Sequence, residues 1–284
     1  MRIDRLLAAG PTRSFEFFPP KSDDEARVLD ATLADLVPLA PSFVSVTYRG
    51  GGESRERTFD LVTRIEREGV MTAMAHLICV GHTRAAMRDV LARYGAAGVS
   101  NVMALGGDVP EDGSSVASDF DHAIDLVALA REVGDFAIGV AAHPQGHPRS
   151  PSRASDRYHL AEKLSLADFA VTQFFFRADE WSTLVDDLGD LGVTKPVLPG
   201  IMPVTTLSGV ARMAVMGAAV PDELIARLVA ANERGGAAAV RAEGIAAATA
   251  LSGELLERGA PGLHFYTLNR STATREIHRA LFEV

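Results

Sequence analysis

The chain has 284 residues, of which 47% are hydrophobic and 23% are charged, and its formal net charge is −9. This composition predicts a folded protein with a sizeable core and excludes a disordered chain. The acidic balance and the lack of a long Lys/Arg run argue against a nucleic acid or an anionic membrane as the partner, and they favour a small-molecule substrate.

The sequence carries no signal for membrane insertion or export. No stretch of 18 apolar residues occurs, and Met1–Gly10 combines two arginines with only a short apolar run. The single cysteine, Cys79, excludes an intrachain disulfide and lies in an apolar run, which is typical of a core residue in a reducing compartment. We therefore expect a cytoplasmic protein, whose oligomeric state the sequence leaves open.

Apolar, β-rich runs alternate along the chain with longer segments of helical spacing. This alternation is typical of parallel βα units, and eight such strands predict an α/β fold, a single (β/α)8 barrel over residues 1–284 with extra helices before the last strand. The expected strands are Ser14–Phe18, Phe43–Thr47, Met71–Leu77, Asn101–Leu105, Phe136–Ala141, Phe169–Phe174, Pro196–Pro199 and Gly262–Tyr266. The expected helices are 23–37, 55–68, 83–96, 118–133, 153–165, 180–190, 205–216, 221–232, 236–258 and 270–282.

The first expected strand carries one carboxylate, Glu16, in the run Ser-Phe-Glu-Phe-Phe-Pro-Pro. A glutamate between Phe15 and Phe17 on a buried strand is costly to ionise, so we expect its pKa to rise toward the range of a general acid. The alternative is a strand-edge glutamate that points into water. Glu16 is the leading catalytic candidate.

In a βα barrel the carboxyl ends of the strands form the active site, so polar residues there are functional candidates. After strand four, Gly106 and Gly107 would let a ligand approach the backbone and Asp108 would present a carboxylate, although an ordinary turn is the alternative. Gln173 is an amide on an apolar strand that could bind a planar ligand or a neighbouring strand. The other candidates are Thr47, Tyr48, His76, His143, His147, Thr172, Tyr266, Asn269 and Arg270.

Several other kinds of site lack their motifs. His143 and His147 lie on a loop with Pro and Gly and without a third ligand of the usual kind, so we expect no metal. No Gly-x-Gly-x-x-Gly follows the first strand, no Gly-x-Ser-x-Gly occurs, and the Gly50–Gly52 run lacks the lysine of a phosphate-binding loop. The absence of these motifs disfavours a separate dinucleotide-binding domain, a hydrolase and a kinase.

Longer motifs follow one another in a fixed order along nearly the whole chain. They are Ser-Phe-Glu-Phe-Phe-Pro-Pro-Lys at 14–21, Phe-Val-Ser-Val-Thr-Tyr at 43–48, Arg-Glu-Arg-Thr at 55–58, His-Leu-Ile-Cys at 76–79, Leu-Gly-Gly-Asp at 105–108, Gly-His-Pro at 146–148, Thr-Gln-Phe-Phe-Phe at 172–176, Pro-Gly-Ile-Met-Pro at 199–203 and Leu-His-Phe-Tyr-Thr-Leu-Asn-Arg at 263–270. Together they resemble the methylenetetrahydrofolate reductase family.

The resemblance implies a βα barrel that reduces 5,10-methylenetetrahydrofolate to 5-methyltetrahydrofolate for methionine synthesis, with hydride from NADH or NADPH. In most members of the family the hydride passes through bound FAD. The resemblance assigns Glu16 as the acid that helps to open the methylene bridge. It implies substrate contacts at Asp108, Gln173, Tyr266 and Arg270. It implies cofactor contacts at Thr47, His76, Gly106, Gly107, Asp108, His143, His147 and Lys163.

Some positions depart from the pattern that the family shows around the flavin. The family commonly has an arginine at Gly106, a tyrosine at His143, an acid at Arg149 and a folate-stacking aromatic near Leu207. Losing charge-assisted bonds and an aromatic wall would weaken FAD binding, and the changes resemble a flavin-independent branch of the family. We expect direct use of NADH without tightly held FAD. The alternatives are an FAD-dependent version, a proline-dehydrogenase-like flavoenzyme and a non-catalytic pterin-binding protein.

Overall fold

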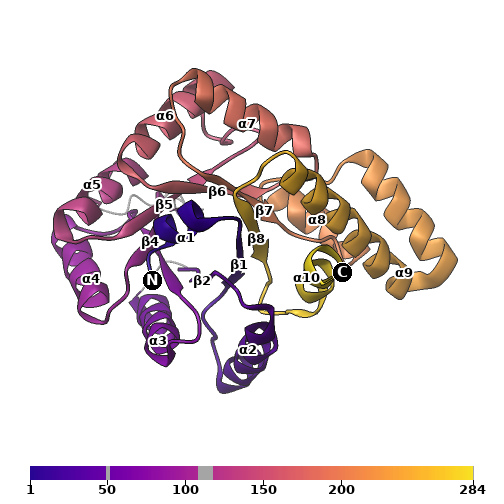
Figure 1. The fold of residues 1–284 in the computed structure, drawn as a ribbon, viewed down its shortest axis with the longest axis horizontal. Helices are drawn as coiled ribbons and strands as arrows, with labels where there is room; N and C mark the ends of the chain where they lie inside the picture. The colour runs from indigo at the N-terminus through magenta and orange to yellow at the C-terminus, as the bar shows by residue number, and fades with distance from the viewer. Residues whose placement is uncertain (49–51, 108–117, 284) are drawn as a thin grey trace.

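The computed structural model describes residues 1–48, 52–107 and 118–283. Within them, eight parallel strands form a closed ring in sequence order, and β8 pairs with β1 (Figure 1). The predicted α/β barrel is confirmed. The strands are β1 (Thr12–Phe17), β2 (Phe43–Val46), β3 (Ala73–Ile78), β4 (Asn101–Leu105), β5 (Ala137–Ala142), β6 (Phe169–Phe174), β7 (Val197–Ile201) and β8 (Gly262–Tyr266).

Helices connect the strands and surround the ring (Figure 1). They are α1 (Ile3–Ala9), α2 (Asp23–Leu36), the short 3-10 helix η1 (Val37–Leu39), α3 (Gly52–Glu68), α4 (Arg84–Ala96), α5 (Ala123–Val133), α6 (Arg153–Leu166), α7 (Ala178–Asp190), α8 (Leu207–Val215), α9 (Asp222–Glu257) and α10 (Thr272–Phe282). In the described parts of the chain, no helix has both the length and the apolar character needed to cross a bilayer.

The extra helices before the last strand are α8 and α9, as expected. The two helices predicted at 221–232 and 236–258 form one bent element, α9, in which Gly235 and Gly236 leave the helical conformation. Gly236 has φ of 63°, in the left-handed region that glycine adopts without a steric penalty. The bend therefore lies close to the predicted break between the two helices.

The amino-terminal end of the barrel is closed by α1, which the sequence did not predict. Ile3 and Leu7 pack in one cluster with inward-facing side chains such as Phe43 and Met103. In Figure 1 this helix lies across the ring of strands. With α1 covering one end, an accessible site can form at the other.

Side chains alternate along β1 between the inside of the ring and the helices outside it. Phe15 and Phe17 belong to the core between strands and helices, whereas Glu16 lines a cavity inside the barrel. On β8, Leu263 and Phe265 face outward in the same way. This alternation brings inward-facing polar side chains from different strands together at the carboxyl end.

Candidate active site

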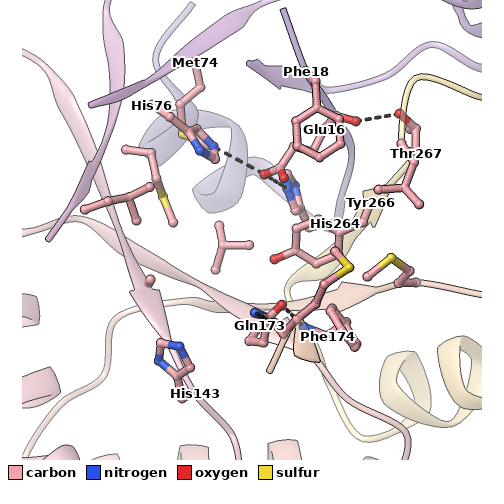
Figure 2. Close-up of a pocket in the computed structure, with 17 residues that line it drawn as sticks. Glu16, Phe18, Met74, His76, His143, Gln173, Phe174, His264, Tyr266 and Thr267 are labelled. Carbon is pink, nitrogen blue, oxygen red and sulfur yellow. Dashed lines mark hydrogen bonds and ion pairs between the residues drawn. The ribbon is translucent and has the colours of Figure 1, made fainter. Parts of the chain in front are cut away.

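The carboxyl ends of the strands surround a cavity of about 270 Å³ (Figure 2). A ligand there meets a mostly apolar wall with a small number of polar groups, which is typical of small-molecule sites. The structure brings together the predicted residues Glu16, His76, His143, Gln173 and Tyr266. The other lining residues are Phe18, Met74, Met103, Leu105, Ala141, Val171, Phe174, Met202, Met216, His264, Thr267 and Leu268.

Glu16 is held by side chains from β2, β3 and β8, and all of them contact the same carboxylate oxygen, Oε2. The hydroxyl of Ser45 donates a hydrogen bond to it at 3.3 Å, while Nε2 of His76 and Nε2 of His264 lie at 3.3 and 3.4 Å (Figure 2). Among the described residues, none hydrogen-bonds to the other oxygen, Oε1. The carboxyl group therefore has one oxygen fixed and one available to a ligand.

The predicted rise in the pKa of Glu16 is wrong, because the pKa lies below its usual value. Burial by itself raises it, but the charge of His76, the hydrogen bond and charge of His264 and the hydrogen bond from Ser45 lower it more. Burial also lowers the pKa of His76, although Glu16 opposes that shift. The free protein thus favours a Glu16 carboxylate beside imidazoles.

His264 connects Glu16 to Ser14, its register partner on β1. Nδ1 of His264 lies 2.8 Å from the Ser14 hydroxyl, which also donates to the backbone oxygen of Leu263 at 3.2 Å. His264 is 1% exposed. His264 is therefore held from the interior of the barrel with its Nε2 directed at Glu16.

Gln173 and Tyr266 line the cavity, but their polar ends already have partners. Nε2 of Gln173 donates to the backbone oxygen of Met216 at 2.9 Å, and the Tyr266 hydroxyl donates to the backbone oxygen of Thr172 at 2.6 Å. Burial and the nearby Glu16 charge raise the pKa of Tyr266 well above its usual value. Tyr266 is therefore neutral, and Gln173 ties the end of α8 to the cavity wall.

The exit of β5 brings His143 into the cavity. Burial, His147 and the nearby cations lower the pKa of His143 to about 4. The predicted cofactor residue Lys163 lies beside this exit but does not line the cavity, because its ammonium donates to the backbone oxygen of Ala141 at 3.0 Å. Burial lowers the pKa of Lys163, and Asp156 opposes that shift.

The remaining predicted residues that the structure describes do not line the cavity. Asp108 lies outside the described residues. Thr47 has a buried hydroxyl without a hydrogen bond in the described structure, and Gly107 has φ of 88°, where an added Cβ would lie 2.4 Å from a Val80 carbon. Gly107 is therefore required by the backbone. The others outside the lining are Gly106, His147 and the exposed Arg270.

The sequence analysis did not identify two groups of residues that line the cavity. His264 lies two residues before the predicted Tyr266, and because side chains alternate along a strand, both face inward. The second group consists of methionines, whose flexible thioethers adapt to flat ligands. They are Met74, Met103, Met202 and Met216.

The chain is similar to known proteins over nearly its whole length. Residues 2–281 match the family model for methylenetetrahydrofolate reductase. The chain is 33% identical over 270 residues to a 5,10-methylenetetrahydrofolate reductase of Pectobacterium carotovorum subsp. carotovorum, covering 94% of this chain and 89% of that protein. It is 34% identical over 285 residues to methylenetetrahydrofolate reductase (NADH) 1 of Arabidopsis thaliana, covering 94% of this chain and 48% of that protein.

A solved structure shares the fold. A protein from Clostridium thermocellum that binds two copies of 5-methyl-5,6,7,8-tetrahydrofolic acid superposes with a TM-score of 0.69 at 12% sequence identity. The match covers 98% of this chain and 96% of that one. At this identity the likeness concerns the fold alone.

Proposed function

This chain belongs to the methylenetetrahydrofolate reductase family, and on that premise we propose that it reduces 5,10-methylenetetrahydrofolate to 5-methyltetrahydrofolate with hydride taken directly from NADH. The observation that carries the proposal is the arrangement of Glu16 at the cavity. Three side chains fix its Oε2, while its Oε1 has no hydrogen bond from the described residues. A proton on Oε1 can therefore be passed to a ligand.

The reaction needs a proton and a hydride at adjacent atoms of the substrate. The one-carbon unit bridges two nitrogens, so Glu16 protonates one nitrogen as its bond to the bridging carbon breaks. The carbon is left as an iminium on the other nitrogen, and hydride adds there to give the methyl group while NADH is oxidised to NAD⁺. The cavity wall holds the two reactants at reacting distance.

Glu16 must gain its proton while ligands fill the cavity, because the free protein favours the carboxylate. A bound pterin displaces water from Oε1, and loss of solvent raises the pKa of a carboxyl group. The proton comes from solvent as the ligands bind, because the fully buried Ser14 beyond His264 already donates its hydroxyl proton to the backbone oxygen of Leu263. The acid is therefore formed in the complex rather than in the free protein.

Tightly held FAD does not fit the described residues, and we assign no step to it. Within the part of the chain that the structure describes, no Lys or Arg lines the cavity to meet a pyrophosphate. The nearby cations Arg157 and Lys163 already donate to backbone carbonyls.

NADH does not need to be bound as tightly by this protein as a resident flavin would. A hydride donor that leaves after each turnover needs only its nicotinamide ring inside, and weak binding of the remainder is sufficient. The Arabidopsis relative is named for NADH, and the chain spans about half of that protein. We extend the NADH preference to this chain. We also propose a cytoplasmic location, which suits the free buried thiol of Cys79.

The test combines a spectrum with an activity assay. The purified protein should show no flavin absorbance, and NADH oxidation should begin when methylenetetrahydrofolate is added without FAD. A stoichiometric flavin spectrum that NADH bleaches and the folate restores would overturn direct transfer but keep the reduction. Folate binding without NADH oxidation, with or without added FAD, would instead identify a binding protein. Turnover with proline in place of the folate would identify a different barrel oxidoreductase.

A further inference from the structure

A buried arginine, Arg157, supports the loop that follows β5 and forms part of the cavity wall. Arg157 is 3% exposed and donates to the backbone oxygens of His143 and Pro144 at 2.9 and 2.6 Å. Its charge is balanced by Asp156 at 2.7 Å and Asp187 at 3.1 Å. Burying a cation is expensive unless it is paired, so this network fixes the loop more firmly than an ordinary turn needs.

A second cation, the partly buried ammonium of Lys163 on α6, supports the same segment. Lys163 donates to the backbone oxygen of Ala141 at 3.0 Å, immediately before the loop that Arg157 holds. The two side chains together fix three backbone carbonyls within the stretch 141–144. The polar side chain that this stretch presents to the cavity is His143 (Figure 2).

The His143 ring is held by a ring contact, but its nitrogens keep their capacity to form hydrogen bonds. It packs edge-on against His147 with ring centres 4.6 Å apart, and neither of its nitrogens makes a hydrogen bond to the described residues. With its pKa lowered to about 4, the ring is neutral at physiological pH. A neutral imidazole offers one donor and one acceptor.

The surroundings of His143 are suited to a flat, uncharged ring. The apolar residues Leu105, Ala141 and Val171 line the same cavity, and the amide of Gln173 is already bonded to the backbone groups of Met216 and Phe174. Figure 2 places His143 across the cavity from Glu16 and His76. A ligand bound at His143 would therefore face the part of the cavity where Glu16 protonates the pterin.

We propose that His143 binds the carboxamide of the nicotinamide ring of NADH and so positions the hydride donor. This inference rests on the proposed function. The carboxamide NH₂ is a donor, and the unprotonated nitrogen of a neutral imidazole accepts one hydrogen bond from it. The nicotinamide ring becomes cationic when it gives up hydride, and a neutral His143 does not oppose that charge as an imidazolium would.

The test compares His143→Phe and His143→Gln with the wild type. Phenylalanine cannot form a hydrogen bond with the nicotinamide carboxamide, so His143→Phe should raise the KM for NADH about tenfold. The KM for methylenetetrahydrofolate should stay within about twofold. His143→Gln keeps an amide donor and acceptor and should recover part of the loss. His159→Gln, at an exposed histidine on α6, is the matched control. Equal changes in both KM values would overturn the assignment to NADH.

A hydride-donor analogue gives a second readout. The 3-acetylpyridine analogue of NADH replaces the NH₂ group by a methyl group, so the wild type should prefer NADH and His143→Phe should lose that preference. An unchanged preference would overturn the proposal. The dissociation constant of NADH, measured by calorimetry without folate, tests His143 even if turnover fails. Tight NADH binding weakened by His143→Phe without turnover would refute the reductase and keep this inference, whereas no NADH binding would overturn it.

Discussion

Two buried polar side chains at opposite ends of the barrel, Asn101 and Glu16, differ in how fully they are hydrogen-bonded. At the amino-terminal end, the fully buried Asn101 accepts the N–H of Ile3 at 2.8 Å and donates to the backbone oxygens of Met1 and Ala73 at 2.9 and 3.1 Å. At the carboxyl end, Glu16 has three partners on one oxygen and none among the described residues on the other. The Asn101 amide is saturated, whereas the Glu16 carboxyl group keeps bonding capacity for a ligand.

This difference indicates where the molecule gains stability and where it supports chemistry. The fully hydrogen-bonded amide of Asn101 links α1 to β3 and β4. Buried polar groups without a hydrogen bond lower stability, and they are retained where a bound ligand supplies the missing partner. Substitutions at the carboxyl end should therefore change activity more than stability. Substitutions at the amino-terminal end should do the reverse.

The largest expected effect is the loss of turnover in Glu16→Gln. The amide keeps the shape of the side chain but cannot donate the proton that opens the methylene bridge, so kcat should fall about a thousandfold. Binding of the pterin should change little, and the free energy of unfolding at neutral pH should fall moderately, because the lowered pKa of Glu16 means that its partners stabilise the carboxylate in the folded protein. Steady-state NADH oxidation and denaturant unfolding measure the two quantities.

The control for this prediction is Glu68→Gln, which makes the same chemical change at an exposed position near the end of α3. It should leave both turnover and unfolding unchanged. Wild-type turnover in Glu16→Gln would remove Glu16 from the acid role. A large drop in stability would contradict the contrast between the two ends.

The next effect should appear at the opposite end of the barrel, in Asn101→Leu. Leucine leaves the backbone groups of Ile3, Met1 and Ala73 without their side-chain partner, and the free energy of unfolding should fall by about 3 kcal/mol. The kcat of the folded fraction should stay close to that of the wild type. Urea unfolding, with activity corrected for the folded fraction, gives both values.

Asn232→Leu is the matched control, because Asn232 is exposed on α9. Its effect on unfolding should stay within about 0.5 kcal/mol. If Asn101→Leu lowered the kcat of the folded fraction as strongly as Glu16→Gln, the two ends would not be separable in this way.

The framework of the barrel could be predicted because its signal is local and repeated. Each strand is an apolar run whose period and length are visible in the sequence, and the predicted β4, β6 and β8 have the observed bounds. The first helix, α1, escaped prediction because it is only seven residues long. Its stability comes from packing of Ile3 and Leu7 on the barrel interior, which no local pattern records.

Part of the cavity lining was predictable from the sequence, but the electrostatics of the cavity were not. Strand ends identified Glu16, His76 and Tyr266, but the direction of the Glu16 pKa shift depends on partners from other strands. The sequence gives no sign that Ser45, His76 and His264 meet at one oxygen, because that meeting depends on the stagger of the closed ring. For the same reason, Lys163 could be predicted near the site while its contact with a backbone carbonyl could not.

The smallest expected effect concerns His278, a buried histidine near the amino-terminal end of β1. It is 2% exposed, neither ring nitrogen makes a hydrogen bond within the described structure, and it packs on Phe282, whose ring lies under the guanidinium of Arg13. Burial and the charges of Arg13 and Arg279 lower its pKa, and Glu283, with a carboxylate oxygen 4.0 Å from Nδ1, opposes them. The folded protein therefore binds this proton less readily than the unfolded chain.

The sign of the pH dependence follows from that difference. The stability is fully present above the ordinary histidine pKa of 6.5 and is lost as the pH falls through that value toward the folded pKa. His278→Phe should make the free energy of unfolding decrease less between about pH 7.5 and pH 5.5, with wild-type turnover at the higher pH. An unchanged slope in urea unfolding would show that His278 does not contribute. A shifted pH–rate profile would link the amino-terminal end to the chemistry, against the separation of the two ends.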